Sequence, residues 1–91
     1  MARLFPIIHE LKIEQKHFEQ IISFKKTFEI RKHDRDFRTN DCLLLREYLP
    51  VTKLYTGRSC LVHVLGLQAG GLFGFDFEYS IMSIKLLSFT N

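Results

Sequence analysis

The stretch of sequence that decides the fold is Lys26-Thr27-Phe28-Glu29-Ile30-Arg31-Lys32. From Thr27 onward, polar and apolar side chains alternate strictly. Successive side chains of a β-strand point to opposite faces, so this pattern predicts a strand with Phe28 and Ile30 on one face. Thr27, Glu29 and Arg31 then share the other face. We expect Phe28 and Ile30 to pack in the core, and the three polar side chains to line an open, concave face.

Outside this stretch, the hydrophobic pattern predicts one helix and four further strands. Phe18, Ile21 and Ile22 fall at positions i, i+3 and i+4, which predicts a short amphipathic helix over residues 14–24. Apolar or alternating runs predict strands over residues 7–13, 42–48, 59–67 and 79–87. This order of elements predicts an α+β fold, a small mixed β-barrel with one helix after the first strand.

The length and composition are those of one small globular domain. The chain has 91 residues, of which 46% are hydrophobic and 25% charged, so we expect a single domain over residues 1–91. This length excludes enzymes that need separate cofactor and substrate domains. Residues 4–8 form an apolar run too short for a signal-peptide core, and no run approaches the ~18 apolar residues of a membrane span. We therefore expect a cytoplasmic protein with no membrane segment.

The net charge of +3 is concentrated in one segment. Residues 25–38 contain six basic and three acidic side chains, whereas the basic and acidic residues in the rest of the chain balance. A basic patch on a neutral background favours a polyanionic partner, nucleic acid before membrane. The alternative, a charged and solvated loop, stays open at this point.

Few local motifs for chemistry are present. The serines lie in no G-x-S-x-G elbow, the glycine-rich residues 70–74 lack the rest of a phosphate loop, and the four histidines are scattered. We therefore expect no metal and no cofactor. The one constellation is Lys26, Glu29 and Arg31, with Thr27 alongside, which offers an anion site and an acceptor for a base edge. The alternative is a Glu29–Arg31 ion pair on a solvated strand.

These same residues carry a resemblance to a known family. Residues 21–31 resemble the signature of ASCH domains, roughly I-x-S-G-x-K-x-x-E-x-R, which belong to the PUA-like β-barrel superfamily. Asn40-Asp41, followed by the apolar residues 42–45, is similar to the turn and strand that come next in those domains. The resemblance covers about residues 8–85 and is to a small bacterial and phage branch of uncharacterised ASCH-like proteins.

The resemblance implies a compact barrel whose cleft is lined by Lys26, Glu29 and Arg31 and binds RNA. One ASCH branch hydrolyses N-acetylcytidine with a Lys, a Thr and a Glu. Its Lys falls on Lys26, but Glu29 occupies its Thr position and its distant Glu has no counterpart here. This chain also has Phe24 where the family commonly has Gly, and Phe disfavours the left-handed conformation that Gly allows.

We therefore expect an RNA- or nucleotide-binding PUA-like domain. Its candidate binding residues are Lys26, Thr27, Glu29, Arg31, Lys32, Arg35 and Arg38. The candidates for base stacking are Tyr48, Tyr55, Phe73 and Phe75. The first alternative is a small hydrolase, an amidohydrolase or nuclease acting on RNA or modified nucleosides, with Lys26 and Glu29 as its catalytic candidates. The second is a non-catalytic interaction module.

Overall fold

The computed structural model describes residues 3–71, 74 and 76–90. Its elements in chain order are β1 (Ile8–Glu14), α1 (Gln15–Ile22), β2 (Phe28–Lys32), β3 (Cys42–Leu49), β4 (Leu54–Ala69) and β5 (Tyr79–Thr90). The predicted order of one helix among five strands and the mixed α+β class are confirmed. Three strands are longer than predicted: β3 by one residue, β4 at both ends, from Leu54 to Ala69 rather than over residues 59–67, and β5, which ends at Thr90 rather than residue 87.

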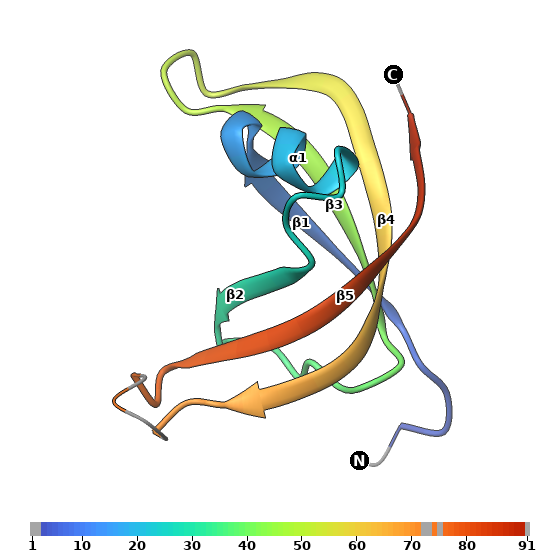
Figure 1. Cartoon of the computed structure of the whole chain (residues 1–91), viewed down its shortest axis with the longest axis vertical. Coiled ribbons are helices and arrows are strands. Elements are labelled where there is room, and N and C mark those ends of the chain that lie inside the picture. The colour runs from blue at the N-terminus through green and yellow to red at the C-terminus, as the bar shows by residue number, and fades with distance from the viewer. Residues whose placement is uncertain (1–2, 72–73, 75, 91) are drawn as a thin grey trace.

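All five strands form one sheet in the order β1-β3-β4-β5-β2. β1 is parallel to β3, whereas the other three pairs are antiparallel. Figure 1 shows this sheet curled into a half-barrel, with α1 lying across one end. The chain leaves β1, passes through α1 and enters β2 at the far edge of the sheet. The curl therefore brings the two edge strands, β1 and β2, toward each other.

The hydrophobic core fills the space between the curled sheet and α1. The helix contributes Phe18 and Ile21, which are 0% and 2% exposed. The inner faces of the central strands contribute Leu43, Leu45, Cys60, Val62, Val64 and Met82. Every second residue is buried from Leu43 to Glu47 of β3 and from Cys60 to Val64 of β4, so the period-2 pattern of these segments fixes which side chains face inward.

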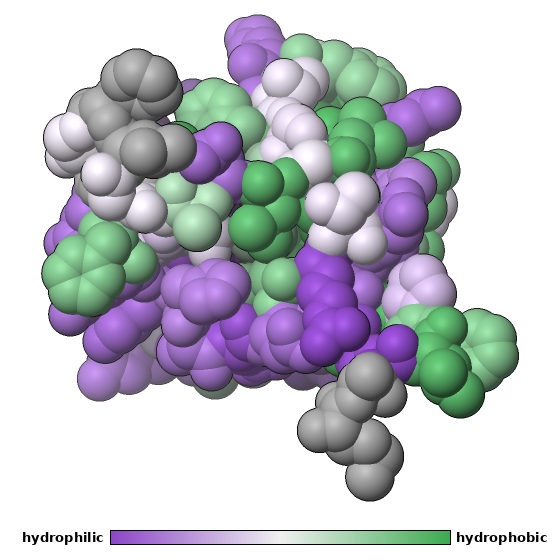
Figure 2. Space-filling view, turned by 90° about the horizontal axis from the view of Figure 1, so that it is seen from below, coloured by the Kyte–Doolittle hydropathy of each residue, from purple (hydrophilic) through white to green (hydrophobic). Residues whose placement is uncertain are grey.

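The prediction that Phe28 and Ile30 pack in the core is wrong. Both side chains are 44% exposed, whereas Glu29 between them is only 3% exposed. The alternation is as predicted, but β2 presents its polar face to the inside. β2 is an edge strand, and its inner face meets cationic side chains rather than the apolar core, so an ion-paired carboxylate is stable there. Apolar side chains also reach the surface elsewhere, as the green areas of Figure 2 show.

This reversal changes the expected cost of truncating Phe28. Phe28→Ala removes a side chain that is already partly in water, so we expect it to lower the free energy of unfolding by only about 1 kcal/mol. Phe18→Ala removes a fully buried ring and should cost about 3–5 kcal/mol. Urea denaturation of the two variants measures the difference, and equal losses would contradict the assignment of the two faces.

The end of α1 contains a second departure from sequence preference. The N–H of Phe24 donates to the carbonyl of Ile21 at 3.0 Å, and the N–H of Lys25 donates to that of Gln20 at 2.9 Å. This is the Schellman arrangement, which normally has Gly in the left-handed conformation. Here that position is Phe24, with φ +63° and a 72% exposed side chain. The helix thus ends as the Gly-containing signature would end it, at the cost of backbone strain.

Replacing Phe24 with glycine is therefore expected to stabilise the domain. Phe24→Gly relieves the left-handed strain and loses little burial, so the free energy of unfolding should rise by about 0.5–1 kcal/mol. Phe24→Ala is the matched control, since it removes the ring but keeps a Cβ at positive φ, and it should give no gain. Thermal melts of the two variants separate these outcomes, and a gain with alanine alone would refute the strain argument.

Candidate functional site: a cationic cleft

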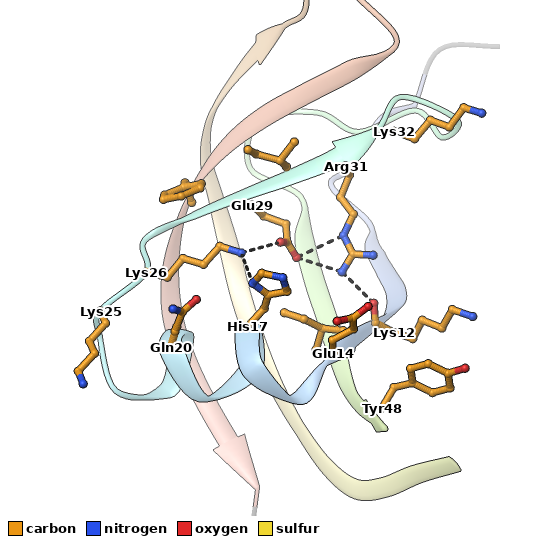
Figure 3. A pocket seen from close by; sticks show the side chains of 13 residues that line it. Lys12, Glu14, His17, Gln20, Lys25, Lys26, Glu29, Arg31, Lys32 and Tyr48 are labelled. Atoms are coloured by element: carbon orange, nitrogen blue, oxygen red, sulfur yellow. Dashed lines mark hydrogen bonds and ion pairs between the residues drawn. The ribbon is translucent and has the colours of Figure 1, made fainter. Parts of the chain in front are cut away.

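A cleft of about 650 Å³ lies between α1, the end of β1 and the inner face of β2. Its lining includes five cationic side chains, Lys12, Lys25, Lys26, Arg31 and Lys32, but only two carboxylates, Glu14 and Glu29. Figure 3 shows Lys25 and Lys32 at opposite ends of the cleft, both pointing outward. A concave surface with this excess of positive charge attracts anions.

Glu29 lies at the centre of the cleft and is almost completely buried. Its Oε2 accepts hydrogen bonds from Arg31, from Nη2 at 3.0 Å and from Nε at 3.3 Å. Its Oε1 lies 3.7 Å from Nζ of Lys26. A buried, unpaired carboxylate would be costly, and these two cations offset that cost from opposite sides (Figure 3).

Arg31 also closes the opening of the half-barrel. Its Nη2 donates to the backbone carbonyl of Lys12, on β1, at 2.9 Å. Arg35, just beyond β2, does the same at the carbonyl of Glu10, with Nη1 at 3.2 Å. The two edge strands are therefore linked through arginine side chains, and the edge of β1 is partly covered.

Lys26 contacts the helix as well as Glu29. Its Nζ lies 3.4 Å from Nδ1 of His17 on α1. An ammonium group can only donate, so in this contact Nδ1 of His17 is the acceptor. Lys26 is therefore held between a carboxylate and an imidazole, a grouping that can bind an anion or pass a proton.

Cys60 has a buried free thiol. Burial, together with the negative charge of Glu29, raises the pKa of Cys60 to about 12. A thiol with this pKa stays protonated at neutral pH. Cys42 and Cys60 are both free. In the described part of the chain, no group of three or more His, Cys, Asp or Glu side chains is placed to hold a metal ion.

The structure brings together four of the seven predicted binding residues. Lys26, Glu29, Arg31 and Lys32 all line the cleft. Thr27 is exposed and is not part of the lining, and its backbone carbonyl accepts from the N–H of Ile84 at 3.0 Å.

The other two basic residues lie outside the cleft. Arg35 lines an adjoining hollow. Arg38 lies on a different part of the surface, where its Nη2 is 2.8 Å from Oδ2 of Asp36. Among the candidates for stacking, Tyr48 lines the cleft and Tyr55 the adjoining hollow, whereas Phe73 and Phe75 lie outside the described residues.

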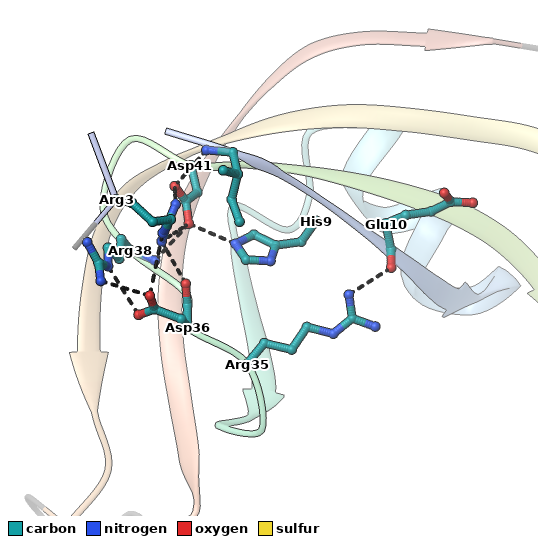
Figure 4. Close-up of polar contacts among 8 residues, drawn as sticks. Arg3, His9, Glu10, Arg35, Asp36, Arg38 and Asp41 are labelled. Carbon is teal, nitrogen blue, oxygen red and sulfur yellow. Dashed lines mark hydrogen bonds and ion pairs between the residues drawn. The ribbon is translucent and has the colours of Figure 1, made fainter. Parts of the chain in front are cut away.

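Arg38 belongs to a polar cluster around Asp41, in the turn before β3 (Figure 4). The Asp41 side chain is fully buried and accepts from Arg3 at 2.8 and 3.0 Å and from the backbone N–H of Ile7 and Arg38. Its Oδ2 lies 2.7 Å from Nε2 of His9. Burial alone would raise the pKa of this carboxyl, but the five hydrogen bonds outweigh it and hold the pKa well below its usual range. This cluster stabilises the turn rather than the cleft.

Several residues of the cleft were not predicted from the sequence. His17 and Gln20 are three apart on α1, so their shared polar face was a signal that the helix presents both to one neighbour. Lys12 gave no such signal, because only the curl of the sheet brings β1 to β2.

Comparison with known proteins places the chain in a family. Residues 8–84 match a family described as a domain of unknown function, DUF3850. The chain belongs to this family. A relative, the "uncharacterized 12.9 kDa protein in GpA 3′ region" of Escherichia phage P2, is 41% identical to it over 51 residues. That alignment covers 56% of this chain and 45% of the relative, so less than half of the relative's length is matched.

Neither description states an activity. No helix in the described residues is both long and apolar enough to cross a membrane.

Proposed function

We propose that the cleft binds RNA or a nucleotide, as expected of an ASCH domain with a PUA-like fold. The observation that carries the proposal is the buried Glu29 carboxylate held between Lys26 and Arg31 inside a strongly cationic cleft. The cleft volume of about 650 Å³ is in the range of small-ligand sites. These two features match the two parts of a nucleotide, the cations its phosphate and the fixed acceptor an amino group of its base.

Each side chain has a distinct role in this proposal. Arg31 and Lys26 contact phosphate, and Lys32 extends the cationic surface outward. Oε2 of Glu29 accepts hydrogen bonds from Arg31, whereas within the described part of the chain the only polar contact of Oε1 is Nζ of Lys26, at 3.7 Å. A carboxylate oxygen has lone pairs for more than one donor. Oε1 is therefore the acceptor for the exocyclic amino group of a base.

The aromatic surface of the cleft comes from Tyr48 and Phe28, and Nζ of Lys26 lies 5.3 Å from the centre of the Phe28 ring. Nζ of Lys12 lies 4.8 Å from the centre of the Tyr48 ring. An aromatic ring beside a cation can stack a base and hold the neighbouring phosphate.

Titration of a fluorescently labelled 12-nucleotide RNA at several salt concentrations tests the proposal. If about four phosphates are contacted, the logarithm of the association constant should fall with the logarithm of salt with a slope near −3. Lys32→Ala should flatten the slope by somewhat less than one unit and weaken all sequences alike. Lys53→Ala, in the exposed β3–β4 loop, is the control and should change nothing. Absence of binding at low salt would reject the proposal in favour of an interaction module.

A hydrolase acting on modified nucleosides is the second candidate, favoured by the placement of Lys26. Its Nζ lies near both His17 and Glu29, a geometry suited to proton transfer. We expect no turnover of N-acetylcytidine, because Glu29 stands where the hydrolytic ASCH branch has its threonine. Chromatographic detection of cytidine tests this. Turnover that Glu29→Gln abolishes would make the hydrolase the first candidate.

A further inference from the structure

A second hollow of about 420 Å³ adjoins the cleft. The two hollows share three lining residues, Lys12, Arg31 and Lys32. These three form the boundary between the hollows, which we call the cationic ridge. The second hollow adds Arg35 to this positive charge. Of its two carboxylates, Glu10 already forms an ion pair with Arg46 at 3.0 Å.

Each hollow contains one tyrosine. Tyr48 of β3 lines the cleft and Tyr55 of β4 lines the second hollow. The two residues are register partners in the sheet, and their ring centres lie 5.8 Å apart with an angle of 60° between the planes. The guanidinium carbon of Arg46 lies 4.0 Å from the centre of the Tyr55 ring, which supports that ring. Each hollow thus combines one tyrosine ring with the cationic ridge that the two hollows share.

We propose that the two hollows are adjacent nucleotide subsites, and that the ligand is a single strand of at least two nucleotides. Its internal phosphate lies on the cationic ridge, one base stacks on Tyr48 and the next on Tyr55. This inference rests on the proposed function and adds the class of ligand to it. A single strand is required because a base must be unpaired and unstacked to lie against a protein side chain.

Arg35 has the capacity to hold a second phosphate. Only its Nη1 is used in the contact with the Glu10 carbonyl, and a guanidinium carries five N–H donors. The residue lies beyond Lys32 along the chain and lines only the second hollow. A nucleic-acid strand that passes from the cleft over the cationic ridge into the second hollow therefore reaches Arg35 next.

Calorimetric titration with matched mononucleotides and dinucleotides tests the inference. The probes are AMP and CMP, and the 5′-phosphorylated dinucleotides pApA and pCpC. We expect at least one dinucleotide to bind about tenfold more tightly than its mononucleotide, since stacking one further base corresponds to about 5- to 150-fold in affinity. Tyr55→Ala and Arg35→Ala should each reduce this ratio several-fold. Tyr55→Phe keeps the stacking ring and should retain the ratio, and Lys85→Ala, exposed on β5, is the control for Arg35.

The outcomes separate the inference from the function on which it rests. If mononucleotides bind but dinucleotides bind no more tightly, the second subsite is refuted and the proposed function stands. If the dinucleotide gain survives both Tyr55→Ala and Arg35→Ala in variants with unchanged thermal melts, the second hollow is again refuted. If no probe binds, the proposed function fails and the inference fails with it.

Discussion

Asp41→Asn is expected to lower the free energy of unfolding by about 3–5 kcal/mol, because it removes one partner of a buried ion pair. The carboxylate accepts from Arg3, His9 and two backbone N–H groups, which all point at one fully buried side chain. Asparagine has the same shape but carries no charge and turns one acceptor into a donor group that faces other donors. Urea denaturation at pH 7 measures the loss.

Asp36→Asn is the matched control. Asp36 also pairs with Arg3 and Arg38, but its side chain is 61% exposed, compared with 1% for Asp41. Exposed ion pairs contribute little to stability, so this variant should unfold near the wild-type urea concentration. If the free energy of unfolding falls equally in the two variants, the buried cluster around Asp41 does not stabilise the turn.

The lowered pKa of Asp41 also contributes to the pH dependence of stability, as does the lowered pKa of the buried Glu47, whose carboxylate accepts hydrogen bonds from Arg58. The folded-state pKa of Asp41 lies below the unfolded value of about 4, so its contribution is complete above about pH 5. The contribution is lost as the pH falls through 4 toward the folded-state pKa, because the unfolded state then binds a proton that the folded state does not. The wild type should therefore lose stability between pH 5 and pH 2 more steeply than Asp41→Asn.

Local pattern was enough to predict the elements of this fold. Apolar spacing located α1, alternation located β2 and the core of β4, and apolar runs located β3 and β5. The strand β4 was predicted too short, because residues 55–58 were expected to lead into a strand that begins at Ser59. In the structure these residues continue the strand, with Gly57 at φ +92° close to a register shift in the pairing with β3.

The order of strands and the facing of β2 could not be predicted in this way. A period of two shows that Glu29 and Arg31 share a face, but not which face is inside. That depends on β2 pairing with β5 at the edge of the sheet, a contact between residues about fifty positions apart. The apolar side chains of β2 favoured an orientation with Phe28 and Ile30 inside, but the structure has Glu29 inside instead. Departures of this kind from the usual pattern are expected at functional sites.

Arg31→Ala is expected to weaken RNA binding more than any other single truncation in the cleft, by about 30- to 100-fold. The variant loses a charge-assisted contact to phosphate, which alone corresponds to about 2–3 kcal/mol. It also leaves Oε2 of Glu29 without the hydrogen bonds from Arg31 and removes the hydrogen bond to the backbone carbonyl of Lys12. The partly unpaired carboxylate then faces the incoming phosphate and repels it. Anisotropy titration of the 12-nucleotide RNA at low salt measures the loss.

The double variant Arg31→Ala/Glu29→Gln separates these two causes. If the carboxylate of Glu29, left without Arg31, contributes to the loss of affinity, removing its charge should recover part of that affinity. The effects of the two substitutions will then not be additive. Glu29→Gln alone should weaken discrimination between bases while leaving contacts to phosphate in place, because it removes the charged acceptor but neither cation. Lys32→Ala is the reference for a plain phosphate contact, since Lys32 has no ion pair with Glu29. If Arg31→Ala costs no more than Lys32→Ala, and the double variant recovers nothing, then Glu29 and Arg31 do not act as the coupled centre of a binding site.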